Sequence, residues 1–128
     1  MAKTKPLIIV ANAYERERAY ERERQFKQSG RIMWTRAELS ELMRVYGREV
    51  ANGNWRDYAL GDGHEAAYFS IFRRTSEVPL YNIAKIPALR RKQGQYILHG
   101  MDGRILRRGH NLTQLMRFFT HRNLRLVN

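Results

Sequence analysis

Residues 34–53 have the sequence WTRAELSELMRVYGREVANG, which is the clearest structural signal in the chain. Thr35 and Glu38 have the spacing of a capping box, in which each side chain accepts a backbone N–H at the start of a helix. Apolar side chains then recur at helical spacing: Leu39, Leu42, Met43, Tyr46 and Val50. The Asn-Gly pair at 52–53 is typical of a helix end. We therefore expect a helix over 35–52 that buries one face.

After this helix the spacing of apolar residues changes from helical to alternating, which is typical of β-strands. The expected strands lie near 55–60, 66–74, 79–85, 95–100 and 104–108. The connections between them are short, and this favours an antiparallel meander because parallel strands need long crossovers. The Asp102-Gly103 pair predicts a tight hairpin between the last two strands.

A second capping pattern begins at Asn111. Apolar residues follow it at helical spacing: Leu112, Leu115, Met116 and Phe119. The segment 124–127, Leu-Arg-Leu-Val, alternates and predicts a short strand. The expected fold class is α+β, with an N-terminal helix, a five-stranded antiparallel β-meander and a C-terminal helix in two layers.

The N-terminal part differs in composition from the rest of the chain. Residues 13–24 repeat AYERER twice, a composition that favours helix. A six-residue period turns the aromatic side chains in three different directions, so no apolar stripe forms. We therefore expect 1–30 to be a basic tail and a charged helical arm, preceding a single globular domain over 31–128.

Several classes of protein are disfavoured by composition. The apolar run at 7–11 is shorter than the core of about 7–15 residues that a signal peptide needs. No stretch approaches the ~20 apolar residues of a membrane span. The absence of cysteine excludes disulfides, thiolate metal sites and a cysteine nucleophile. These features predict a cytoplasmic protein that has no membrane partner.

The charge is strongly positive and uneven. Lys and Arg number 24 against 12 Asp and Glu, for a formal net charge of +12. Residues 65–128 carry 12 basic and 3 acidic side chains, a net charge of +9. Such a field attracts phosphate backbones. Of the 24 basic residues 19 are arginine, whose planar fork matches phosphate oxygens.

Basic residues of the second half lie near the expected strand ends and loops. We expect them to form one nucleic-acid-binding face made of Arg73, Arg74, Arg90, Arg91, Lys92, Arg104, Arg107 and Arg108. In the strand over 66–74, Phe69 and Ile71 share one face. Tyr68 and Phe72 share the other, where they can stack on bases if the helices cover only the first. The alternative is that Tyr68 and Phe72 also belong to a core.

No catalytic pattern is present. The four histidines lack the spacing of a metal site, and there is no nucleophile elbow, phosphate-binding loop or dinucleotide fingerprint. We expect no catalytic residue, no metal and no cofactor. The sequence predicts a small non-catalytic nucleic-acid-binding module, with RNA or a ribonucleoprotein favoured over DNA. The alternative is an adaptor that docks its arginine-rich face on an acidic protein; the sequence leaves this choice and the oligomeric state open.

Separated motifs also occur in a familiar order: WRDYA at 55–59, FSIFRR at 69–74, PLY at 79–81, RKQG at 91–94 and RRGH at 107–110. Over about residues 31–127 the chain resembles a family of short alphaproteobacterial proteins of unknown function. The resemblance implies a bacterial cytoplasmic setting. It implies no activity and assigns no functional residues.

Overall fold

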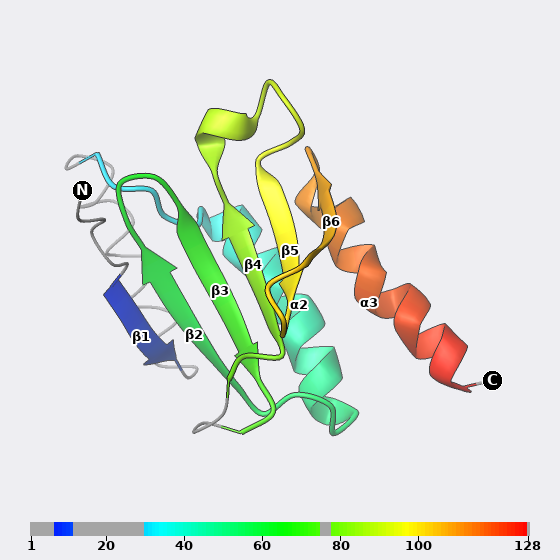
Figure 1. Cartoon of the computed structure of the whole chain (residues 1–128). Coiled ribbons are helices and arrows are strands. Elements are labelled where there is room, and N and C mark those ends of the chain that lie inside the picture. Colours follow the sequence, from blue (N-terminus) through cyan, green and yellow to red (C-terminus); the bar gives the residue numbers. More distant parts are fainter. Residues whose placement is uncertain (1–6, 12–29, 75–77, 128) are drawn as a thin grey trace.

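The computed structural model describes residues 7–11, 30–74 and 78–127. Its elements are β1 (Leu7–Ala11), α2 (Arg36–Ala51), β2 (Asp57–Asp62), β3 (Ala67–Phe72), β4 (Tyr81–Lys85), the 3-10 helix η1 (Pro87–Leu89), β5 (Tyr96–Gly100), β6 (Ile105–Gly109) and α3 (Leu112–Val127). The strands form one antiparallel sheet in chain order, from β1 to β6. Helix α2 crosses behind this sheet, and α3 lies next to β6 (Figure 1). The predicted α+β class and its helix, meander, helix order are confirmed.

Helix α2 begins at the predicted capping box. The Thr35 hydroxyl accepts the Glu38 N–H at 3.1 Å, and the Glu38 carboxylate accepts the Thr35 N–H at 2.8 Å. The buried positions of the helix are Leu39, Leu42, Val45 and Glu49. Val50 was expected in the core and is instead 40% exposed, because it lies about 100° of helical rotation beyond the buried Glu49.

The same Glu38 carboxylate joins the start of α2 to the sheet. It accepts a hydrogen bond from Lys85 Nζ at 2.8 Å and another from the Tyr96 hydroxyl at 2.5 Å. Lys85 Nζ also donates to the Met33 carbonyl at 2.9 Å. Lys85 ends β4 and Tyr96 begins β5, so one carboxylate holds the helix and two neighbouring strands together.

The two faces of the sheet differ as the alternation in β3 predicted. Phe69 and Ile71 are fully buried in the core that the sheet forms with α2 and α3. Tyr68 and Phe72 lie on the opposite face, where each is half-buried. The prediction that β3 divides its aromatic residues between two faces is confirmed.

Strand β1 is a correction to the predicted architecture. It pairs antiparallel with β2, with Leu7 opposite Asp62 and Ala11 opposite Tyr58. A domain boundary at residue 31 would leave this strand outside the fold, whereas its backbone pairing places it in the sheet. The repeat at 13–24 lies outside the residues that the structure describes.

The C-terminal helix is longer than predicted. The Asn111 side chain accepts the Gln114 N–H at 2.9 Å and caps the helix start. The four expected core residues of this helix are all buried. The strand predicted over 124–127 is wrong, because α3 continues to Val127.

Strands β5 and β6 are joined by the predicted Asp-Gly turn and contain a bulge. Gly103 has a φ of +85°, and its N–H donates to the Gly100 carbonyl at 3.0 Å. Leu98 pairs with Arg107, whereas His99 pairs with Ile105, so the register shifts between them. Leu106 is the additional residue, and a bulge of this kind turns the side chains on either side of it in new directions.

We expect Leu42→Ala to destabilise the fold by about 2–5 kcal/mol, because the side chain is fully buried and its removal leaves a cavity. Chemical denaturation should give this difference. The exposed Ser40→Ala serves as the matched control on the same helix, and equal stability of the two variants would contradict the packing described for α2.

The pKa of Glu38 predicts a pH dependence of stability. Burial raises this pKa, but the hydrogen bonds from Lys85, the Thr35 backbone and Tyr96 outweigh burial, so the pKa lies below its ordinary value of 4.5. A carboxyl group with a lowered pKa stabilises the fold above its ordinary pKa, and this contribution is lost as the pH falls through the lowered value. Glu38→Gln should therefore melt well below the wild type at neutral pH, and the difference should shrink in acid below pH 4.5.

Thermal melting across this pH range measures the effect, with the exposed Glu65→Gln as control. A melting difference that stays constant down to the most acid pH would show that Glu38 does not act through its charge.

Candidate nucleic-acid interface

Three cations lie together in the connection between β4 and β5. The chain first forms η1, where Arg90 N–H donates to the Pro87 carbonyl at 3.1 Å, and then turns again. Lys92 N–H and Gly94 N–H both donate to the Leu89 carbonyl, at 3.0 and 3.2 Å. Between these bonds lie the exposed side chains of Arg90, Arg91 and Lys92, which we call the cationic turn.

The cationic turn is fixed against β6. Gly94 is buried and has a φ of +102°, a conformation that favours glycine. A Cβ at this position would overlap the backbone of Gly109. The Arg108 guanidinium also donates to the Gln93 side-chain oxygen. This close approach and this hydrogen bond hold the turn in one position relative to the sheet.

The charge of the cationic turn is not neutralised within the described parts of the chain. The ion pairs there include Arg31 with Asp62, Arg44 with Glu41, Arg48 with Glu49, Lys85 with Glu38 and Arg104 with Asp102. None of them includes a cation of the turn. Arg108 adds a fourth positive charge beside it, and its partner Gln93 is neutral. This end of the sheet therefore carries four positive charges that no described carboxylate neutralises.

The other predicted cations do not share this location. Arg73 and Arg74 follow β3 at the opposite end of the sheet, where Arg104 lies in the hairpin turn. Strands of five or six residues separate the two ends, a distance of roughly 15–20 Å at about 3.3 Å per residue. Arg107 lies over the Phe118 ring of α3, with its guanidinium carbon 5.6 Å from the ring centre. The predicted single face is thus two clusters at opposite ends, with Arg107 on the helix side.

Tyr68 and Phe72 lie on the sheet face that connects these two ends. Tyr68 is paired with Gly61 and Ala84, near the end that carries the cationic turn. Phe72 is paired with Asp57 and directly precedes Arg73. Both rings are half-buried, so part of each is accessible to a ligand on this face.

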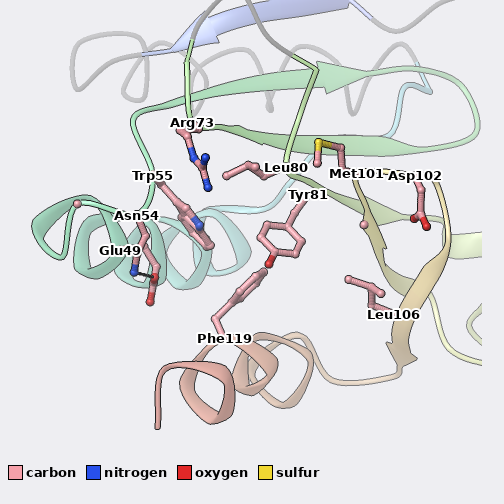
Figure 2. Close-up of a pocket in the computed structure, with 12 residues that line it drawn as sticks. Glu49, Asn54, Trp55, Arg73, Leu80, Tyr81, Met101, Asp102, Leu106 and Phe119 are labelled. Carbon is pink, nitrogen blue, oxygen red and sulfur yellow. Dashed lines mark hydrogen bonds between the residues drawn. The ribbon is translucent and has the colours of Figure 1, made fainter. Parts of the chain in front are cut away.

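A pocket that the sequence did not predict lies at the hairpin end of the sheet (Figure 2). Its volume is about 770 Å³. The Phe119 ring packs edge-on against Trp55 at 4.8 Å and against Tyr81 at 4.9 Å between ring centres. Arg73 lines the same pocket and reaches toward Trp55 in Figure 2. Helical and strand spacing assign these aromatic residues to a core, and nothing in the sequence indicates that they border a cavity.

A buried carboxylate lines the edge of this pocket. Glu49 is only 3% exposed, and its side chain accepts a hydrogen bond from the Asn54 amide at 2.9 Å. The Glu49 carbonyl accepts the Asn54 N–H at 2.9 Å, which shapes the chain as it leaves α2. Among residues 30–74 and 78–120, no three His, Asp or Glu side chains gather into a group that could hold a metal ion. No helix within the described ranges has the length and apolar character needed to cross a membrane.

One comparison with known proteins gives a match. The model of the family described as "Protein of unknown function (DUF2794)" matches residues 32–116, a segment that includes α2, β2 to β6 and the cationic turn. The searches of curated proteins and of solved structures give no match. The match covers most of the chain and agrees with the resemblance seen in the sequence motifs. The chain therefore belongs to the DUF2794 family of proteins of unknown function.

Proposed function

We propose that this protein is a non-catalytic nucleic-acid-binding module of the cytoplasm, and that its cationic turn contacts the phosphates of single-stranded RNA. The proposal rests on the exposure and the unpaired charge of Arg90, Arg91 and Lys92. All three are exposed, and none has a carboxylate partner within the described residues. Cations of this kind bind a phosphate backbone and release its counterions.

The fixed position of the turn supports the proposal. A flexible basic segment loses conformational entropy when it binds, and this opposes association. The close backbone approach of Gly94 to Gly109 and the hydrogen bond from Arg108 to Gln93 already hold the turn in place in the free protein. Two arginines beside each other also present planar forks that match phosphate oxygens.

The arrangement of the elements favours RNA in single-stranded form. Tyr68 and Phe72 are half-buried on the face between the two cationic ends, and aromatic rings beside arginines are typical surfaces for stacking unpaired bases. Helices α2 and α3 are separated in the chain by β2 to β6. They therefore do not form a helix-turn-helix that would enter the major groove of DNA.

A second candidate function is a protein-interaction adaptor. The hairpin end supports it, because Met101 is 61%, Ile105 51% and Leu106 40% exposed. Exposed apolar residues that cluster next to cations are typical of a docking surface for another protein. An acidic partner with apolar side chains would fit this end of the sheet, and nucleic-acid binding that fails the tests below would favour the adaptor.

We expect Gly94→Ala to displace the cationic turn, because the new methyl group would overlap Gly109 and the backbone has a positive φ. The backbone strain alone should cost about 1–3 kcal/mol, and the overlap should add to it. Gly103→Ala is the matched control, since its φ is +85° but no atom lies within 4 Å of the added methyl group. Thermal melting should rank Gly94→Ala as clearly less stable than Gly103→Ala, and the reverse order would disprove the close approach.

The proposed interface is tested by replacing Arg90, Arg91 and Lys92 together with alanine. Affinity for a single-stranded RNA should fall with salt, with a log–log slope of about −0.7 for each phosphate contacted. If all three cations touch phosphates, the triple variant should therefore have a slope shallower by about 2. Fluorescence anisotropy with a labelled RNA across a salt series gives both slopes.

The control removes the same charge elsewhere, by replacing the exposed Arg44, Arg56 and Arg117 with alanine. It should leave the slope near that of the wild type. Equal losses in the two triple variants would show that only net charge matters, and wild-type binding no tighter than about 1 μM at physiological salt would place it in the non-specific range. Either result would overturn the proposal.

A further inference from the structure

The pocket at the hairpin end combines an apolar floor with unused hydrogen-bond donors. Trp55 and Phe119 are 5% and 3% exposed and form the floor with Tyr81. The Phe119 ring packs edge-on against both Trp55 and Tyr81, and the Trp55 and Tyr81 rings are tilted by 53° at 6.2 Å between their centres, so a ligand would lie against this cluster of three rings. Within the described residues, neither the Trp55 indole N–H nor the Tyr81 hydroxyl has a hydrogen-bond partner.

Some charged groups around this floor already make hydrogen bonds or ion pairs, and one does not. Glu49 is bonded to Asn54, and Asp102 is paired with Arg104 at 3.6 Å. Arg73 is exposed and has no ion pair or hydrogen bond in the part of the chain that the structure describes. Among the residues that the structure describes, the pocket therefore presents one free cation and two free neutral donors, together with carboxylate and amide oxygens that can still accept a hydrogen bond.

These groups select a narrow class of ligand. A purely apolar molecule would cover these donors and leave them without partners, which costs free energy. A small anion would use Arg73 and leave the aromatic floor uncovered. A heteroaromatic ring with acceptor and amino groups on its edge, joined to a phosphate, satisfies all of these groups at once. The volume of about 770 Å³ also lies within the range of about 300–1,000 Å³ that is typical of small-molecule sites.

We propose that this pocket binds one unpaired nucleotide, with the base on the Trp55, Tyr81 and Phe119 surface and the phosphate at Arg73. The identity of the ligand rests on the proposed nucleic-acid function, and the pocket supplies a second contact at the end of the sheet opposite the cationic turn. The nucleotide can be free in solution or part of a strand. The same chemistry recognises both, and the experiment separates them.

Tryptophan fluorescence tests the proposal directly, because Trp55 lines the pocket and Trp34 does not. The chain has two tryptophans, so Trp34→Phe leaves Trp55 as the sole reporter. This substitution removes the hydrogen bond from the Trp34 indole N–H to the Tyr68 carbonyl at 3.1 Å. In this background, adenosine monophosphate should quench the emission to saturation. Calorimetry on the unmodified protein measures the same affinity without using the Trp34 variant.

The position of the phosphate is tested with Arg73→Ala, which should weaken binding of the monophosphate about tenfold or more, as expected for the loss of a charged hydrogen bond. It should leave binding of the uncharged adenosine unchanged. Arg56→Ala, another exposed arginine next to the strand paired with β3, is the control and should change neither affinity. Ribose 5-phosphate, which lacks the base, should compete poorly with the monophosphate.

Each outcome decides the proposal. A single-stranded tetranucleotide that competes at lower concentration than the monophosphate identifies a strand as the source of the ligand, and the opposite order identifies the free nucleotide. The proposed nucleotide site would be disproved if neither ligand bound to saturation. It would also be disproved if Arg73→Ala and Arg56→Ala lost the same affinity for the monophosphate. The triple variant of the cationic turn distinguishes the two proposals. If the pocket fails while that variant still loses RNA affinity, the proposed function stands alone.

Discussion

The Glu38 carboxylate accepts hydrogen bonds from the Thr35 N–H, Lys85 Nζ and the Tyr96 hydroxyl. These donors come from the start of α2, the end of β4 and the beginning of β5. The last two flank the segment 86–95 that carries the cationic turn. One half-buried acid therefore caps a helix and also fixes both ends of the surface to which we assign nucleic-acid binding. The close approach of Gly94 to Gly109 also fixes the segment against β6 just before β5 begins.

Most of the fold could be predicted from local patterns. The capping box at Thr35 needs only residues that are adjacent in the chain, and the Asp-Gly turn at 102–103 likewise depends on local conformation. Strand β1 depends instead on a partner far along the chain, because Leu7 pairs with Asp62. A five-residue apolar run beside a charged repeat contains no sign of that partner. The segment 124–127 alternates like a strand, yet it continues α3 because the preceding helix extends to Val127.

The sequence predicted which cations belong to the candidate site, but it did not predict how they are arranged on the surface. Spacing along β6 suggested that Arg104, Arg107 and Arg108 share one region, but the bulge at Leu106 changes the direction of the chain between them. Arg107 then faces Phe118, whereas Arg108 contacts Gln93. The pocket was missed for a different reason. Trp55 and Phe119 are aromatic residues at positions where the spacing predicts a core. The cavity beside them arises only from the arrangement of the three elements around them.

We propose that the cationic turn is the primary contact for single-stranded RNA. Two-dimensional NMR of the labelled full chain, titrated with a short RNA at physiological salt, tests it most directly because each backbone amide reports separately. We expect the largest saturable shifts at residues 89–94, with a second group around Trp55 and Tyr81 if the pocket is also filled. Largest shifts confined to the hairpin at 101–106, or small shifts spread evenly over all surface amides, would contradict it.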